Sequence, residues 1–274
     1  MVTIVSHFHN AKVMINNFVT LLDLSSWRSL GDVVASMFAL GYHENIQNKP
    51  DVPAFLVELR RTAFGRVYSA DKNVAIFLGR PPRMSKRFCY FQIPSSQTIA
   101  ENQMLGPPGQ SGASPWSTDA KMDYISETRW SALCASLKEE ILELFFCEDR
   151  SIHASKARLV SKPFLLPSQK LKTPSEISHR AEVQWQALPA DFRLIGSLTQ
   201  LNYRTPFERD FMASTRLNHL HVQFLLRLVL LTCLTEPDGT IVEIAQQMLA
   251  LTVETILLRD HLANSGTGLI WKVC

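Results

Sequence analysis

The most regular spacing of apolar and polar positions in this chain runs from residue 53 to residue 78. Apolar side chains recur there at the spacing of one helical face: Phe55, Leu56, Leu59, Ala63, Phe64, Val67 and Tyr68. Pro53 suits the first turn of such a helix, and Asp51 is a candidate N-cap. Gly79 and the prolines after it, Pro81 and Pro82, end the pattern. These positions predict a helix of roughly 37 Å that forms the spine of a helical domain.

Five further stretches have helical periodicity, at about residues 27–38, 130–145, 177–188, 206–234 and 244–256. The last three follow Thr-x-x-Glu sequences, in which the two side chains satisfy free backbone N–H groups reciprocally. These capping boxes are Thr173/Glu176, Thr205/Glu208 and Thr240/Glu243. In the last helix one side carries Ile244, Ala245, Met248, Leu249, Thr252 and Ile256. Strand alternation is almost absent, so we expect an all-α, irregular multi-helix domain built around a long central helix.

Two polar segments interrupt this pattern. Residues 94–120 are rich in Ser, Gly, Pro and Gln, and residues 148–172 form a second polar connector. Both are predicted to be mobile loops within a single domain over residues 20–265. The aromatic run Phe88–Ile93 is a candidate extended segment.

Composition narrows the class of protein. The 274 residues are 46% hydrophobic, which is enough for a large core. A net charge of +3 is too small to indicate nucleic-acid binding by itself. The five cysteines show no C-x2-C spacing, which favours a reducing compartment over a disulfide framework or a zinc cluster. The apolar run Val222–Leu234 is shorter than the about 20 residues of a membrane span, so we expect a core helix.

No motif of a known catalytic or nucleotide-binding site is found in the sequence. The histidine pairs, His7/His9 and His219/His221, are two residues apart, so a helix would point them to different faces. We expect His219 and His221 to be partly buried and hydrogen-bonded. The acidic run Glu139, Glu140 and Glu143 beside Lys138 is expected to be a solvated helix face. No catalytic, cofactor-binding or metal-ligating residue is predicted.

Polar residues within the spine helix carry more information. Glu58 and Arg61 are three apart, a spacing that permits an ion pair. Asp71 lies on an otherwise apolar side and needs a cation or several donors, for which Arg80 and Arg66 are candidates. We expect a buried ion pair that fixes the helix to the loop after it, and the alternative is a direct effector contact.

The basic positions after the helix are expected to form a solvated loop, with contact to nucleic acid or an import receptor as the alternative. They are Arg80, Arg83, Lys86 and Arg87.

Four elements in order then resemble a known family: Leu40-Gly-Tyr-His43, Glu58-x-Arg60-Arg61, Tyr68-x-x-Asp71 and Leu78-Gly-Arg-Pro81. They look like the fungal-specific transcription factor domain, the middle homology region of fungal zinc-cluster regulators. Trp185-x-x-Leu188-Pro189 resembles a later element of that family, and the match extends from about residue 27 to 258. The resemblance assigns structural or regulatory roles to His43, Glu58, Arg60, Arg61, Tyr68, Asp71, Gly79, Arg80, Pro81, Trp185 and Pro189.

The resemblance implies a non-enzymatic regulatory domain in the nucleus. It would respond to a small-molecule effector, or contact other transcription regulators or itself. The family's six-cysteine zinc cluster has no counterpart in the sequence, so no zinc and no direct DNA reading are carried over, and DNA contact is expected only indirectly. The sequence is also short of the family pattern ahead of residue 27. Gly65 replaces a bulky aromatic of the family, and we expect a gap in packing there.

Two other readings remain open. One is an α-helical small-molecule-binding protein or enzyme with a pocket among the long helices. The other is a membrane-associated protein that uses Val222–Leu234, although we expect no membrane partner.

Overall fold

The computed structural model describes residues 27–45, 52–94, 116, 120–156, 172–231 and 239–263. The predicted all-α class is confirmed, since these residues form helices and include no strand. A first helix covers residues 27–39. The other α-helices are α2 (Ala54–Leu78), α3 (Tyr124–Lys156), α4 (Pro174–Ala187), α5 (Pro206–Leu231) and α6 (Gly239–Leu257). Short 3-10 turns are η2 (Ala190–Phe192), η3 (Leu198–Gln200) and η4 (Arg259–His261).

The predicted spine helix is present as α2. Pro53 lies at the N-cap position, one residue before the first turn in which it was predicted, and Asp51 lies outside the described residues. Gly79 ends the helix in the left-handed conformation, with a φ of 61°. Its N–H and that of Arg80 donate to the carbonyls of Ile76 and Ala75. These two hydrogen bonds satisfy carbonyl groups of the last helical turn, which the left-handed conformation of Gly79 makes possible.

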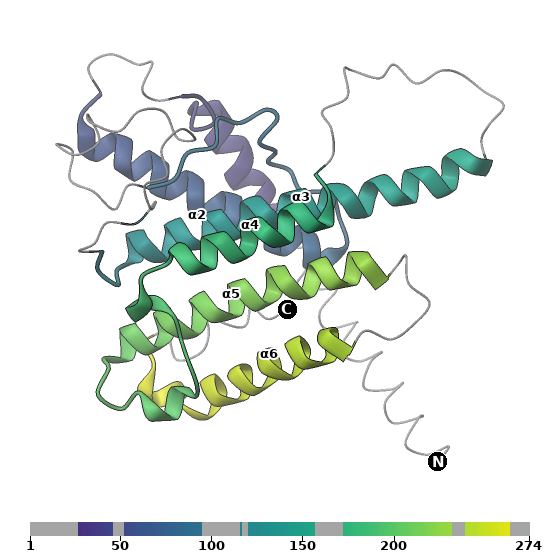
Figure 1. The fold of residues 1–274 in the computed structure, drawn as a ribbon. Helices are drawn as coiled ribbons and strands as arrows, with labels where there is room; N and C mark the ends of the chain where they lie inside the picture. Colours follow the sequence, from purple (N-terminus) through teal and green to yellow (C-terminus); the bar gives the residue numbers. More distant parts are fainter. Residues whose placement is uncertain are drawn as a thin grey trace.

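The centre of the architecture is α3 and not α2, which corrects the prediction of a central spine. In Figure 1 the helices lie in layers, with α2 and α4 beside α3, α5 next, and α6 at the edge. α3 contacts α2, α4 and α5, and α5 in turn contacts α4 and α6. Every residue of α3 from 134 to 142 is buried. α2 occupies the place between the first helix and α3, because its Phe64 and Tyr68 pack with Val34 and Met37.

The larger apolar core lies among α3, α4 and α5. It includes Trp130, Leu137 and Ile141 of α3, with Ile177 and Trp185 of α4. Burial of each such side chain contributes roughly 1.5–3 kcal/mol. The α5 residues of the apolar run that begins at Val222 join this core, as predicted: Val222, Leu225, Leu226 and Val229 are buried.

Both predicted loops differ from expectation where the structure describes them. α3 continues to Lys156, past Glu148, because no glycine or proline interrupts residues 146–156. Trp116, inside the predicted loop 94–120, is buried and packs edge-on against Phe192, with ring centroids 5.7 Å apart. The segment Phe88–Ile93 forms no strand, and the backbone N–H of Tyr90 donates to the carbonyl of His43.

Two of the three predicted capping boxes are present. At α4, Glu176 N–H donates to Thr173 Oγ1 and Thr173 N–H donates to the Glu176 carboxylate. The same reciprocal pair joins Thr205 and Glu208 ahead of α5. The third is wrong, because α6 already includes Gly239 and Thr240 therefore lies inside the helix.

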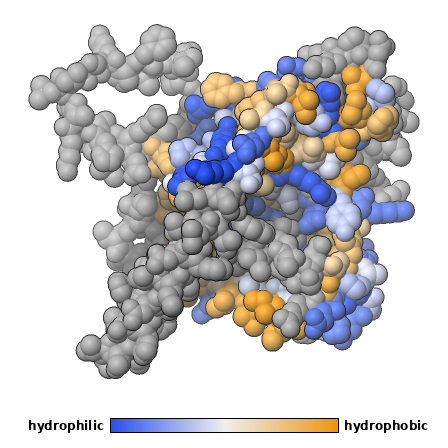
Figure 2. Space-filling model, turned by 180° about the vertical axis from the view of Figure 1, so that it is seen from behind, coloured by the Kyte–Doolittle hydropathy of each residue, from blue (hydrophilic) through white to orange (hydrophobic). Residues whose placement is uncertain are grey.

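The apolar side expected for α6 is its buried side only in part, since Ile244 is buried and Met248 packs against the core. Ile244, Leu251 and Thr255 are buried, whereas Leu249 and Ile256 are more than half exposed. Apolar residues occur on both sides of this helix, so periodicity did not select the buried side. Figure 2 shows apolar atoms along the lower edge of the molecule, where α6 lies in Figure 1. Within the described residues, α6 has the length and the apolar composition that a membrane-spanning helix needs. These two properties alone are weak evidence of a membrane role.

Candidate functional site

The family-like residues at the end of α2 surround a buried ion pair. Asp71 and Lys72 are fully buried, with the Lys72 ammonium 2.8 Å from the Asp71 carboxylate. Asp71 also accepts hydrogen bonds from the backbone N–H groups of Arg83 and Met84, at 3.0 and 2.9 Å. Lys72 further donates to the Met84 carbonyl and lies 3.6 Å from Glu139. The predicted attachment of α2 to its end loop is present, but its cation is Lys72.

The predicted cations of Asp71 have other roles. Arg66 donates to Thr128 Oγ1 at 3.2 Å, and the Arg80 guanidinium lies over the Trp27 ring at 5.3 Å. Sequence reasoning missed Lys72 because adjacent helical residues do not face each other in an ideal helix. The long Lys72 side chain nevertheless reaches back to its neighbour.

Glu139 on α3 completes this buried cluster. Its carboxylate accepts hydrogen bonds from the Tyr68 hydroxyl, from Ser85 Oγ at 2.9 Å and from Lys86 N–H at 2.9 Å. Burial raises the pKa of Tyr68 well above its usual range, and the charge of Glu139 raises it further. Tyr68 therefore acts as a neutral donor that joins α2 to α3.

The prediction of a solvated acidic face on α3 is wrong. Glu139 and Glu140 are buried, and Lys138 is 1% exposed. Lys138 donates to Asn73 on α2 and Asn218 on α5. Only Glu143 lies near the surface, where it pairs with Arg87 at 3.2 Å. The charge pattern along α3 is that of an exposed face, but α2 and the segment after it cover that face.

Three cations converge on Glu140. Lys86 and Lys172 each lie 2.8 Å from Oε1, and Arg180 pairs with Oε2. Burial by itself raises the pKa of Glu140. Hydrogen bonds from Lys172 and Lys86, together with the charge of Arg180, lower the pKa by more than burial raises it. The pKa of this carboxyl consequently lies below its ordinary value.

The basic segment after α2 is mostly engaged, which corrects the solvated-loop prediction. Arg83 stacks on the Trp27 ring at 3.5 Å and donates to the Trp27 carbonyl at 2.8 Å. Lys86 and Arg87 pair with glutamates of α3. These contacts use cations that a nucleic acid or import receptor would otherwise bind.

Most of the remaining family-like residues of the 40–81 segment contact other side chains of the protein. Glu58 and Arg61 form the predicted ion pair at 2.8 Å. The Arg60 guanidinium lies over the Tyr42 ring at 5.2 Å, and His43 packs edge-on against Phe38. The last residues of the motif are exposed: Gly79, Arg80 and Pro81.

Gly65 is closely packed, contrary to the predicted gap. A methyl group placed there would lie 3.2 Å from Thr128 Cγ2 and 3.5 Å from Ala132 Cβ. The family-like aromatic side chain has no room at this position. α2 and α3 approach each other closely because residue 65 has no side chain.

The other family-like pair, Trp185 and Pro189, lies further along the chain and belongs to a different site. Trp185 is buried at the end of α4, and Pro189 follows its C-cap residue, Leu188. Trp185 lines a cavity of about 410 Å³ that is bounded by α4, the segment 193–196, α5 and α6. Leu194, Leu220 and Leu251 supply apolar parts of its wall.

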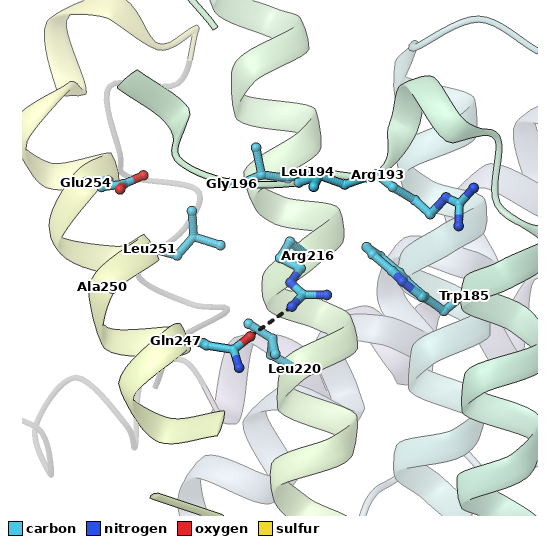
Figure 3. A pocket seen from close by; sticks show the side chains of 11 residues that line it. Trp185, Arg193, Leu194, Gly196, Arg216, Leu220, Gln247, Ala250, Leu251 and Glu254 are labelled. Carbon is cyan, nitrogen blue, oxygen red and sulfur yellow. Dashed lines mark hydrogen bonds between the residues drawn. The ribbon is translucent and has the colours of Figure 1, made fainter. Parts of the chain in front are cut away.

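Polar side chains from three elements line this cavity (Figure 3). Arg216 on α5 donates to Gln247 Oε1 on α6 at 2.8 Å, and its guanidinium lies 5.4 Å from the Trp185 ring centre. Burial lowers the pKa of Arg216, and the charge of Glu182 offsets this only in part. Glu254 on α6 accepts from Ser197 Oγ and Leu198 N–H, at 2.7 and 2.8 Å. Arg193 donates to Gln186 Oε1 at 3.2 Å, and its buried Nε has no hydrogen-bond partner among the described residues.

His219 packs against Trp185, one of the residues that line the cavity. The two rings stack with centroids 4.4 Å apart. Burial and, to a smaller extent, the charge of Arg216 together lower the pKa of His219 to about 4. His221 is also buried, and within the described part of the chain its Nδ1 has no hydrogen-bond partner, so the predicted hydrogen bonding is not found at that atom.

The two places differ in what they can do. The Asp71 cluster is filled by its own partners and has a structural role. The cavity has apolar walls, two guanidinium groups and one carboxylate, which is the make-up of a ligand site. Within the described residues no group of three His, Cys, Asp or Glu side chains is placed to hold a metal ion. Comparison of the chain with protein-family models, curated proteins and solved structures gave no match.

Proposed function

We propose that this chain is a regulatory, non-enzymatic domain of the fungal zinc-cluster transcription-factor type. It acts in the nucleus through contacts with other regulators or with itself. It reaches DNA through a separate DNA-binding module, in the same protein or in a partner.

The observation that carries this proposal is the structural role of the family-like residues between positions 40 and 81. The polar residues of this segment are those by which the sequence resembles the family, and they make structural contacts within α2, to the segment after it and to α3. Tyr68 binds Glu139, Asp71 binds Lys72 and two backbone N–H groups, and Glu58 binds Arg61. A motif that is maintained for architecture suits a regulatory domain better than a catalytic one.

A reporter assay in a fungal host tests this proposal. The full chain is fused to a heterologous DNA-binding module, and transcription from a promoter with that module's site is measured. We expect transcription to change relative to the module alone, and the Asp71→Leu variant to lose the effect. Arg28→Gln, an exposed change on the first helix, is the matched control and should behave as the unmodified chain. A folded, expressed fusion with no effect on transcription, and no nuclear accumulation of the chain itself, would contradict the proposal.

A second candidate function is the binding of a small molecule. The specific observation in its favour is the cavity of about 410 Å³ beside Trp185, with polar groups converging on leucine walls. This volume lies within the range of ligand pockets. In a regulatory domain such a molecule would be an effector, so the two functions are compatible.

A further inference from the structure

The cavity beside Trp185 contains a cation for which the described residues supply no ion-pair partner, although the more distant Glu182 acts on it through its charge. Arg216 makes one hydrogen bond, to the neutral amide of Gln247, although a guanidinium carries five N–H donors. Across the described part of the chain, no carboxylate lies within ion-pair distance of Arg216. The charge of Arg216 is therefore only partly compensated in a partly buried place. An anion that binds there would form charge-assisted hydrogen bonds, which are stronger than those between neutral groups.

A second guanidinium adds to the positive character of this site. Arg193 lines the same cavity, and in Figure 3 it lies on the other side of Trp185 from Arg216. Its guanidinium also donates to a neutral amide, that of Gln186. Two cations beside one indole ring favour an anion over a cation as the ligand.

The rest of the wall sets the shape and polarity of that ligand. Leu194, Leu220 and Leu251 offer apolar surface next to Arg216, which suits a hydrocarbon or aryl body. Glu254 places a carboxylate on the same cavity, held by Ser197 and Leu198. A ligand with a second carboxylate would meet this like charge, which is a repulsive contribution to specificity.

We propose that the cavity binds a monocarboxylate with an apolar body, whose carboxylate pairs with Arg216. This inference rests on the second candidate function and names its ligand class. Glu254 excludes dicarboxylates of the same length. A planar carboxylate matches the guanidinium fork, which is why arginine and not lysine suits this position.

Octanoate is the probe for this site, and it is titrated into the full chain by calorimetry. Suberate, 1-octanol and octylammonium are the matched dicarboxylate, neutral and cationic probes. For a ligand of this size we expect octanoate to bind with a Kd of about 0.1–1 mM. Suberate, 1-octanol and octylammonium should each bind at least about tenfold more weakly.

Four variants locate the binding. Arg216→Gln should weaken octanoate about tenfold or more, and Arg216→Lys should weaken it less. Arg28→Gln, outside the cavity lining, should leave the affinity unchanged. Glu254→Gln should strengthen suberate binding, a gain that unfolding cannot mimic. Thermal unfolding of each variant shows whether it is folded.

The outcomes separate the ligand class from the cavity function. If 1-octanol or octylammonium binds as well as octanoate, or if Arg216→Gln has no effect, the monocarboxylate assignment is overturned while a small-molecule site stands. If none of the four probes binds up to about 10 mM, the assignment and the cavity function both fail. Neither result bears on the reporter assay of the regulatory domain.

Discussion

The carboxylate of Asp71 lies 2.8 Å from the ammonium of Lys72, and neither side chain has solvent exposure. Each charge depends on the other, since water does not reach them. Two backbone N–H donors and the nearby Glu139 complete the arrangement. The cluster consequently fixes three parts of the chain at once: α2, the segment after it and α3.

Replacement of Asp71 by Leu should strongly destabilise the domain. The buried Lys72 would lose its nearest carboxylate and be left with Glu139 at 3.6 Å, and two backbone N–H groups would lose their acceptor. Removal of one partner of a buried pair typically costs about 3–5 kcal/mol of unfolding free energy. Urea unfolding followed by circular dichroism measures this loss.

The partly exposed pair on the same helix provides the comparison, since the side chains of Arg61 and Glu58 are 15% and 28% exposed. Glu58→Gln removes the ion pair with Arg61, and should cost about 1 kcal/mol, less than the buried pair, because solvent partly screens these charges. Wild-type thermal stability and wild-type partner binding in Asp71→Leu would together show that the buried pair does not hold the domain.

Residue 65 gives a prediction of the opposite kind, in which a side chain is added. Gly65→Ala gains about 1 kcal/mol of helix propensity. That gain is offset because the new methyl group lies 3.2 Å from Thr128 Cγ2. Thr128 cannot turn away freely, since its hydroxyl donates to the Tyr124 carbonyl at 2.7 Å and accepts from Arg66. We expect little net change for Ala and a loss of about 1–3 kcal/mol or more for Phe.

A double substitution tests this explanation. Thr128→Ser removes the crowded methyl group and keeps the hydroxyl. The Gly65→Ala/Thr128→Ser double variant should therefore be more stable than the sum of the two single changes in unfolding free energy predicts. A double-mutant cycle measures this difference. Additive effects, or a stable Gly65→Phe variant, would indicate the packing gap that the sequence suggested.

The sequence predicted those features that depend on nearby residues. The Thr173/Glu176 box, the left-handed Gly79 cap and the Glu58–Arg61 pair each involve residues within a few positions of one another. Local chemistry decides such features, so a single sequence is sufficient to find them.

Features that depend on distant partners were not predictable in the same way. Glu139 and Glu140 read as a solvated face because their partners, Tyr68, Ser85 and Lys86, lie more than 50 residues away in the chain. The cavity likewise joins side chains from four separate segments. Only Trp185 and its neighbourhood carried a signal in the sequence, and that signal was family resemblance and not chemistry.

Glu254 should control the order of the segment between η2 and η3. Its carboxylate accepts from Ser197 Oγ and from Leu198 N–H, and both donors lie at the start of η3. Glu254→Ala removes both bonds, at a cost of about 1–3 kcal/mol. Hydrogen exchange of residues 194–201 should accelerate while exchange in α3 stays unchanged, as mass spectrometry of peptides measures. Unchanged exchange at Leu198 would show that this carboxylate does not hold the segment.

Acid should destabilise the domain through His219. A histidine in the unfolded chain has a pKa of about 6.5. Burial lowers the pKa of His219 in the folded domain to about 4. Between these values the unfolded chain binds a proton that the folded domain does not, so stability is complete above about pH 6.5 and falls as the pH drops toward 4. The loss from this one residue amounts to at most about 3 kcal/mol.

Two other groups act in the same direction, and substitutions separate them. The pKa of His221 is lowered by burial and by the charge of Lys138, and the lowered pKa of Glu140 adds a loss that begins at more acidic pH. His219→Gln should flatten the fall of the urea midpoint between pH 7 and about pH 4.5, because its contribution to the proton linkage is gone. His179→Gln, an exposed change on α4, should leave the slope as it is. If His219→Gln and the unmodified chain lose stability equally over this interval, His219 takes up its proton without unfolding.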